Sequence, residues 1–182
     1  NNITADADID YFIITADDRL WLTRAMVILI VRLAETQGIT LCPNYFLAKR
    51  AIELETQTLY AAREITQMVP LVGLEVYQQF RSANDWTADY LPNAAAPPPQ
   101  LGRVYERQKR PLLEHTLLTP FGQALEQWEQ QRKIPRFQAQ QLATQNRESS
   151  FSADWCKGHF NQHLTRVMSI YSHNLDQLKH KV

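Results

Sequence analysis

Three residues near the C-terminus have the types and spacing of metal ligands. Cys156, His159 and His163 follow the pattern C-x2-H-x3-H, which on a helix brings three donor groups onto adjoining turns. Zinc takes a fourth ligand, or keeps an open position, and no further donor lies nearby in the sequence. The same pattern is also expected if Cys156 is a small residue at the edge of a buried helix face and the two histidines lie at the boundary of that face. We therefore predict no metal site and no cofactor, and retain Cys156, His159 and His163 as the ligands to check.

Other groups with catalytic residue types lack the context that catalysis requires. Glu114 and His115 are adjacent, and adjacent residues on a helix point to different faces. Ser149, Ser150 and Ser152 lie without the strand-turn-helix pattern of a nucleophile elbow. The sequence contains no glycine-rich phosphate loop. We expect a protein that is not an enzyme, and an enzyme with a site built from distant residues is the third of three hypotheses.

Positive side chains in the second half of the chain indicate a surface for an anionic partner. One group is spaced as on a helix face, and a second surrounds a predicted helix junction. Each cation that neutralises a phosphate releases a condensed counterion, which favours binding. The alternative without a partner is that these cations form a solvated face, or a face that packs against the acidic half of the chain. The candidate nucleic-acid-binding residues are Arg103, Arg107, Lys109, Arg110, Arg132, Lys133 and Arg136.

Aromatic and amide side chains lie among these cations. Tyr105, Trp128 and Phe137 have rings that can stack on unpaired bases, although helical spacing favours core packing for Trp128. Eight glutamines between residues 123 and 145 add hydrogen-bonding groups without charge. Such a surface suits a polar interface, and it also suits a plain solvated helix.

The formal net charge of zero hides a separation of charge along the 182 residues. Residues 1–100 contain seven Lys and Arg against twelve Asp and Glu, and residues 101–182 contain twelve against seven. The two halves therefore have net charges of −5 and +5. Hydrophobic residues make up 45% of the chain and charged residues 21%, which is typical of a folded protein and excludes a disordered one.

The sequence pattern predicts helices throughout. The first is expected over residues 16–37, preceded by a capping group at Thr15 and ended by Gly38. Its middle is apolar on nearly every face, which predicts a place at the centre of a bundle. A second helix is expected over residues 43–68.

Further helices follow from apolar spacing and from prolines at helix starts. No strand-like alternation of comparable length is present. We therefore predict an all-α fold, an irregular bundle of about six or seven helices. The later helices are expected around Val72, Val76 and Phe80, over 101–118 with an interruption at Pro111, from Pro120, from a restart at Pro135, and from Ser152 to about Leu178.

Three consecutive prolines mark the best candidate for a domain boundary. Pro97, Pro98 and Pro99 favour an extended connector, and the sign of the charge changes at this point. We predict an acidic helical lobe over residues 1–92, a connector over 93–100 and a basic helical lobe over 101–182. A single domain with a long crossover loop explains the same pattern equally well.

The leading functional hypothesis is a non-catalytic binding module or complex subunit that contacts nucleic acid through its basic half. The runner-up is a protein-protein adaptor that uses the acidic half or the glutamine-rich helices. We expect a soluble, cytoplasmic protein, since the longest apolar run, residues 25–31, is too short to span a bilayer. The chain begins at Asn1, which leaves a processed or exported form as the alternative, and that form would allow a Cys42–Cys156 disulfide.

Overall fold

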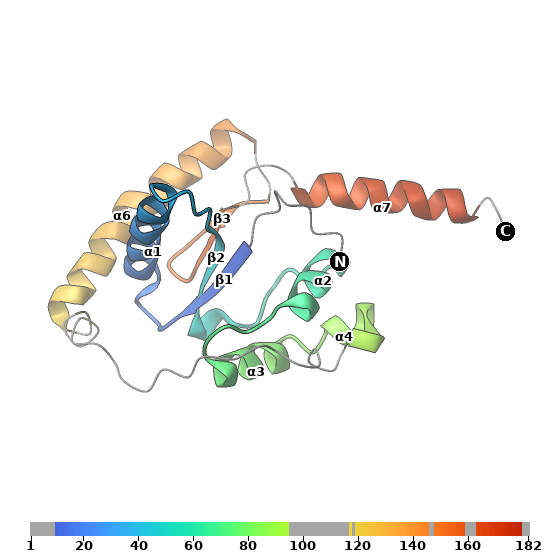
Figure 1. Ribbon diagram of the computed structural model, residues 1–182, viewed down its shortest axis with the longest axis horizontal. Helices are drawn as coiled ribbons and strands as arrows, with labels where there is room; N and C mark the ends of the chain where they lie inside the picture. The colour runs from blue at the N-terminus through green and yellow to red at the C-terminus, as the bar shows by residue number, and fades with distance from the viewer. Residues whose placement is uncertain (1–9, 95–116, 118, 146–147, 159–162, 180–182) are drawn as a thin grey trace. The chain divides into compact units, whose positions relative to one another are not determined.

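The computed structural model describes residues 10–94, 117, 119–145, 148–158 and 163–179 (Figure 1). These residues fall into two compact units. Unit 1 contains residues 10–51 and 117–158, and unit 2 contains residues 52–94 and 163–179.

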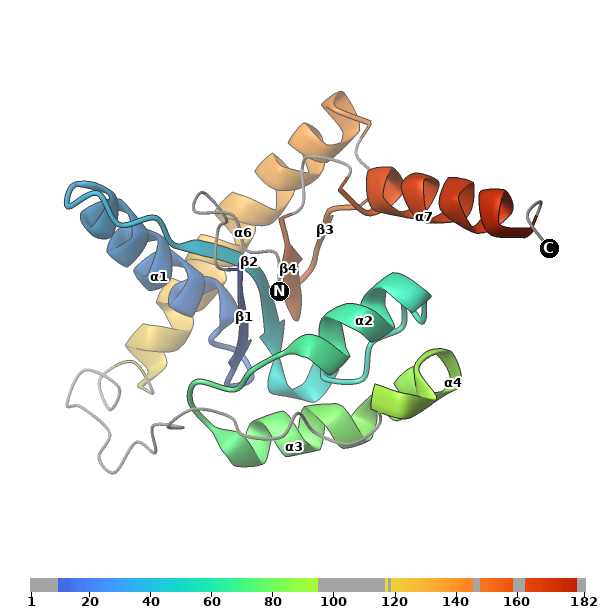
Figure 2. The ribbon, with the colours of Figure 1, turned by 45° about the vertical axis from the view of Figure 1, so that its right-hand side comes forward.

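Unit 1 contains a mixed four-stranded sheet, so the predicted all-α fold is wrong. The strands are β1 (Asp10–Thr15), β2 (Cys42–Ala48), β3 (Ser150–Phe151) and β4 (Trp155–Lys157). Their order is β1-β2-β4-β3 (Figure 2). β1 and β2 are parallel, and β4 is antiparallel to both β2 and β3. Helix α1 (Leu20–Glu35) connects the two parallel strands, because a parallel pair needs a crossover between its ends.

β2 lies where the sequence predicted the start of a helix over residues 43–68. Phe46, Leu47 and Ala48 are consecutive and all buried, so the strand shows no alternation of apolar and polar residues. A short apolar run buried on both faces has the same sequence pattern as a buried helix segment. Pro43 lies near the start of the strand, a position that proline tolerates. The helical part of this prediction is confirmed only from Leu59 on, where α2 begins.

The segment after Ser152 was also predicted as helix, and it forms a β-hairpin. The Ser152 hydroxyl accepts hydrogen bonds from the backbone N–H groups of Asp154 and Trp155, at 3.0 and 3.1 Å. These bonds stabilise the turn between β3 and β4. A serine hydroxyl that accepts from nearby backbone N–H groups favours a turn over a helix. The final helix, α7, covers His163–Lys179.

The predicted first helix is confirmed as α1, but its predicted place at the centre of a bundle is wrong. Gly38 follows it with a φ of +74°, a conformation that suits glycine. Leu29, Ile30 and Leu33 are 60%, 55% and 58% exposed. The buried residues of α1 are Leu20 and Trp21 in the first turn and Val31 further along. The apolar middle of the helix therefore does not have neighbours on every side.

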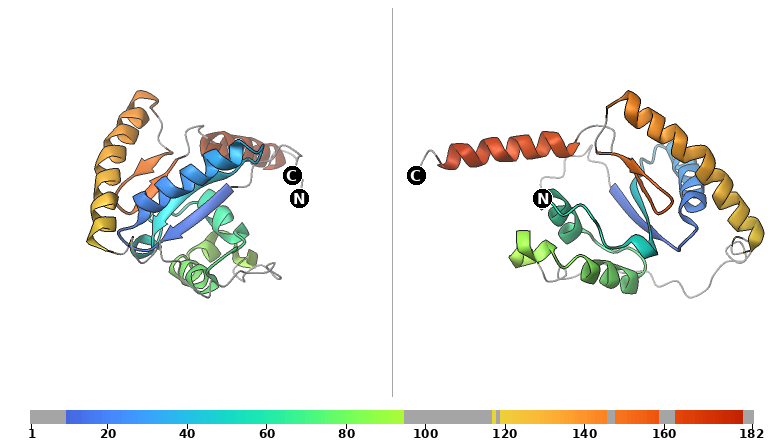
Figure 3. Two further views of the ribbon diagram at one scale, coloured as in Figure 1. Left: turned by 60° about the vertical axis from the view of Figure 1, so that its left-hand side comes forward. Right: turned by 180° about the vertical axis from the view of Figure 1, so that it is seen from behind.

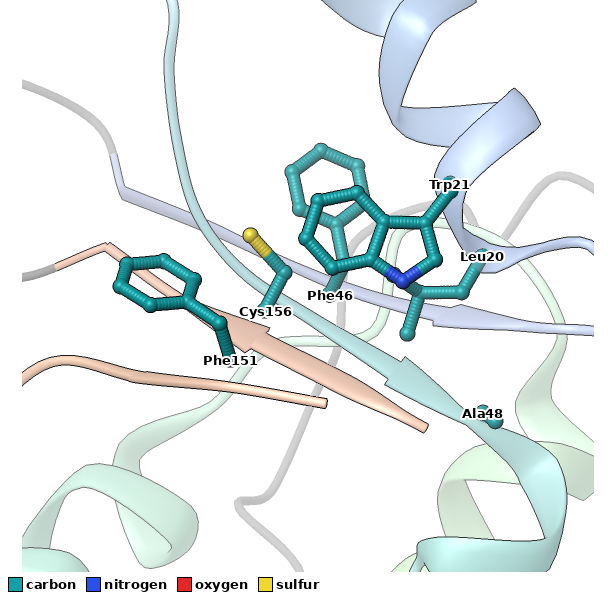
Figure 4. Close-up of a cluster of buried hydrophobic side chains, with 6 residues drawn as sticks. All are labelled: Leu20, Trp21, Phe46, Ala48, Phe151 and Cys156. Atoms are coloured by element: carbon teal, nitrogen blue, oxygen red, sulfur yellow. The ribbon is translucent and has the colours of Figure 1, made fainter. Parts of the chain in front are cut away.

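The core of unit 1 lies between the sheet and the first turns of α1. Leu20 and Trp21 of α1 are completely buried and pack with side chains of β2, β3 and β4. Figure 4 shows these side chains pointing toward one another. The cluster consists of Leu20, Trp21, Phe46, Ala48, Phe151 and Cys156.

Helix α6 (Pro120–Ala143) packs beside α1 (Figure 3). The predicted start at Thr119-Pro120 is confirmed, with Thr119 as the N-cap residue. The predicted restart at Pro135 is wrong, because Pro135 lies inside one continuous helix of 24 residues. Ile134 and Phe137, on either side of the proline in sequence, pack against the core. This burial keeps the helix continuous despite the missing proline N–H.

Glu126 of α6 caps the N-terminus of α1. Its Oε1 accepts a hydrogen bond from Trp21 N–H at 2.8 Å, and its Oε2 accepts one from Leu22 N–H at 2.6 Å. The residue is only 4% exposed. Burial raises the pKa of this carboxyl group, and the two backbone hydrogen bonds oppose that rise. The Glu126 carboxylate thus faces the unpaired backbone N–H groups at the N-terminus of α1, where the helix dipole is positive.

Unit 2 is helical in the part of the chain that the structure describes. It contains α2 (Leu59–Gln67), α3 (Leu74–Ala83), α4 (Thr87–Tyr90) and α7, with a short 3-10 helix, η2, over Pro92–Ala94. A second 3-10 helix, η1 (Lys49–Ala51), follows β2 in unit 1. The prediction of a third helix through Val76 and Phe80 is confirmed, with Phe80 fully buried. Val72 precedes that helix and is exposed.

The side chain of Asn84 organises unit 2 from a fully buried position. Its Oδ1 accepts hydrogen bonds from Leu54 N–H at 2.9 Å and from the Trp86 indole at 3.1 Å. Its Nδ2 donates to the carbonyls of Ile52 and Phe80 at 2.7 and 2.8 Å. All four hydrogen-bonding positions of the amide are therefore used.

The predicted connector and lobes stay a prediction, because residues 95–116 lie outside the described residues. The sheet combines strands from both predicted lobes, β1 and β2 from residues 1–92 and β3 and β4 from residues 101–182. Within the described ranges, no helix has the length and apolar character needed to cross a membrane.

Replacing Glu126 by Ala is expected to lower the free energy of unfolding by about 3 kcal/mol, because two buried backbone donors lose a charged acceptor. Urea denaturation of the full chain measures this loss. The control is Gln127→Ala on the exposed side of α6, with an expected change within about 0.5 kcal/mol. Equal effects from the two variants would contradict the capping role.

Replacing Asn84 by Asp is expected to cost about 3 kcal/mol, because a carboxylate cannot donate to the two carbonyls and would be buried with a charge. Thermal and urea denaturation are the measurements. The exposed Asn93 offers a matched control, since Asn93→Asp makes the same chemical change at the surface. If Asn84→Asp unfolds with the same free energy as the native chain, the four hydrogen bonds do not contribute to stability.

Candidate nucleic-acid interface

The structure describes three of the seven predicted nucleic-acid-binding residues. Arg132, Lys133 and Arg136 lie on two successive turns of α6. The other four, Arg103, Arg107, Lys109 and Arg110, lie outside the described residues. The junction predicted between Arg132 and Arg136 is a continuous helix, so these cations have the fixed spacing of helix neighbours.

Arg132 lies between a carboxylate and an aromatic ring. Its Nε and Nη2 both donate to Glu129 Oε2, at 3.1 and 2.5 Å. Its guanidinium carbon lies 4.6 Å from the ring centre of Trp128. The Arg132 side chain is half exposed, whereas the Glu129 side chain is only 6% exposed. The pair therefore places the positive group outward and the negative group inward.

Lys133 faces the other side of the same carboxylate. Its Nζ lies 4.0 Å from Glu129 Oε1 and 5.7 Å from the ring centre of Phe137. Burial is the largest cause that lowers the pKa of Lys133, and the carboxylate of Glu129 opposes this shift. The nearby charges of Arg132, Arg24 and Arg136 lower it further. The charges of the three arginines therefore act on Lys133.

Arg24 is the member of this group that the sequence did not indicate. It belongs to α1, and its guanidinium carbon lies 4.7 Å from the ring centre of Phe137 on α6. The side chain also lies 6.0 Å from the ring centre of Trp21. Only the packing of α1 beside α6 brings it to Lys133, and no signal in the sequence specifies that packing. We call the set Arg24, Arg132, Lys133 and Arg136 the basic cluster.

The aromatic predictions have mixed outcomes. Phe137 packs with Phe151 at 5.0 Å and with Trp21 at 6.1 Å between ring centres, so it is a core residue. Trp128, for which core packing was the favoured role, is 58% exposed. Tyr105 lies outside the described residues. Two of the glutamines are structural, since Gln138 and Gln141 donate to the carbonyls of Phe151 and Ser149.

The helix proposed to align Cys156, His159 and His163 is not present as predicted. Cys156 is buried on β4 of unit 1, and His163 begins α7 in unit 2. His159 lies outside the described residues. Burial raises the pKa of the Cys156 thiol, and Arg24 opposes that rise. Within the described part of the chain, no group of three or more His, Cys, Asp or Glu is arranged to hold a metal ion.

No disulfide joins Cys42 and Cys156 in the described part of the chain. Cys42 lies on β2 and donates to the side-chain carbonyl of Asn44 at 3.2 Å, and Cys156 lies on β4. The Cys42 thiol is partly buried, and the Cys156 thiol is buried.

A second charged group lies where β1 and β2 end. Arg50 forms ion pairs with Asp18 at 2.8 Å and with Asp154 at 2.5 Å. Its backbone N–H donates to Asp17 Oδ1 at 2.7 Å. These contacts raise the pKa of Arg50, the hydrogen bond to Asp154 contributing most. The group ties the β1–α1 turn to the β3–β4 hairpin, so we assign it a structural role.

Comparisons with protein-family models, with curated proteins and with solved structures gave no match.

Replacing Glu129 by Gln is expected to lower the pKa of Lys133 further, because the carboxylate is the group that raises it. NMR titration of the Lys133 side chain measures the change. Glu35→Gln, at an exposed position of α1, removes the same charge elsewhere and serves as the control. A pKa of Lys133 that does not fall in Glu129→Gln would contradict the arrangement of the cluster.

Proposed function

We propose that this protein is a non-catalytic binding module that contacts nucleic acid through the basic cluster. The observation that carries the proposal is that Arg24 of α1 and Lys133 of α6 converge on the ring of Phe137. Glu129 lies between Lys133 and Arg132, and Arg136 follows Arg132 by one turn of the same helix. Glu129 is buried on the inner side of α6. The outward charge of the cluster is therefore positive.

The distribution of roles within the cluster supports a phosphate-binding surface. Arg24 and Lys133 lie over Phe137 in the region where α1 and α6 meet, and they supply positive potential from a partly desolvated position. Arg132 and Arg136 are exposed and four residues apart on α6, so both can reach successive phosphates of one strand. Arginine suits this task because its planar guanidinium matches phosphate oxygens in pairs.

Replacing both Arg132 and Arg136 by Glu is expected to abolish most of the affinity for labelled single-stranded and duplex oligonucleotides. Fluorescence anisotropy, repeated between about 50 and 200 mM salt, measures the affinity and its salt dependence. For the native chain, log Kd is expected to rise steeply with log salt, and the slope should fall by about one for each arginine removed.

The matched control is the double variant Arg32→Glu, Arg63→Glu. Both arginines are exposed outside the basic cluster, and the overall change of charge is the same. Equal losses in the two double variants would indicate a nonspecific effect of net charge. Undetectable or salt-independent binding by the native chain would reject the proposal.

A protein-protein adaptor is the second candidate function, and one specific observation favours it. Leu29, Ile30 and Leu33 lie within one turn of α1 and are each more than half exposed. Contiguous apolar side chains of this kind mark interaction surfaces. If the partner is a protein, its complex should be lost on Leu29→Asp with Leu33→Asp and retained in the Arg132 and Arg136 variant.

A further inference from the structure

The outer face of α6 carries aromatic and positive side chains in one row. Phe121, Trp128, Arg132 and Arg136 are spaced by seven, four and four residues, which places them on one side of a helix. All four are exposed. The neighbouring side of the helix carries Gly122, Glu126 and Glu129, which are buried, and Glu129 contacts Arg132 of the row.

Trp128 is unusual in this row because a large aromatic side chain gains most from burial. It is 58% exposed, and the guanidinium of Arg132 is stacked at its ring. The arginine holds the indole from one side by a cation–π contact. An exposed ring held in this way is not a core residue. Together with the cations on the next two turns, it forms a surface suited to a flat, anionic ligand.

We propose that this row binds single-stranded nucleic acid, with an unpaired base stacked on Trp128 and the adjoining phosphates beside Arg132 and Arg136. The inference rests on the proposed function and names its preferred substrate. In a duplex, the faces of the bases are already stacked on their neighbours and cannot reach an indole ring, whereas a single strand presents them. The cations alone would bind both forms, so the aromatic ring decides between them.

The experiment compares two probes of the same length. One is a labelled oligothymidine of about 16 nucleotides, and the other is the duplex that it forms with oligoadenine. Affinities for both are measured by fluorescence anisotropy for the native chain, Trp128→Ala, Trp128→Phe and the control Leu142→Ala. Leu142 is an exposed apolar residue of the same helix, 79% exposed.

We expect the native chain to bind the single strand more tightly than the duplex. Trp128→Ala should weaken single-strand binding by about tenfold and leave duplex binding within about twofold, since base stacking is removed and the charges remain. Trp128→Phe should restore most of the loss, because it keeps a ring. Leu142→Ala should behave like the native chain. Thermal denaturation of each variant separates lost binding from lost folding.

Three results would overturn the inference. Equal affinity for both probes, with no effect of Trp128→Ala but a steep dependence on salt, would reject the single-strand preference and leave the proposed function intact. No binding of either probe would reject both. A loss in Trp128→Ala that Trp128→Phe does not restore would show that the indole acts through packing and not through stacking.

Discussion

Unit 1 depends on the contact between the carboxylate of Glu126 and the N-terminus of α1. Two carboxylate oxygens meet two backbone N–H groups within 2.8 Å, in a position removed from solvent. The desolvation that raises the pKa of Glu126 is the cost of this arrangement, and the backbone hydrogen bonds and the α1 dipole compensate for it. The contact fixes Trp21, whose indole N–H also bonds to the carbonyl of Ser152 at 2.9 Å. Trp21 therefore joins α1, α6 and the β3–β4 hairpin.

This packing explains why positive charge collects on α6. The inner side of the helix carries Glu126 and Glu129, and the core residue Phe137 follows on the same side. Glu126 is used by the backbone of α1, and Glu129 is used by Arg132 and Lys133. With Arg24 brought beside Lys133, the cations outnumber the carboxylates that contact them. The proposed nucleic-acid surface is thus a consequence of how two helices dock on the sheet.

Part of this arrangement could be predicted from local sequence, and part could not. α1, the start of α6 and the helix through Phe80 carry local signals in apolar spacing, a terminating glycine and a first-turn proline, and these helices are confirmed. The cap predicted at Thr15 is wrong, because Thr15 ends β1 and its hydroxyl donates to the carbonyl of Leu47. β2 lacks alternation because both of its faces are covered, so its apolar run was interpreted as helix. The contact between Glu126 and Trp21 joins residues 105 positions apart, and Arg24 reaches Phe137 of α6 only because α1 packs beside α6. One sequence contains no local pattern for such pairs.

An NMR titration of the arginine side-chain N–H signals with a short oligothymidine tests whether α1 and α6 together form the binding surface. We expect the signals of Arg24, Arg132 and Arg136 to shift together and to saturate at one ligand concentration, while that of Arg63 in unit 2 stays unchanged. Shifts confined to Arg63 and other residues outside the basic cluster, or shifts of Arg132 and Arg136 without Arg24, would contradict a surface built by the docking of α1 on α6.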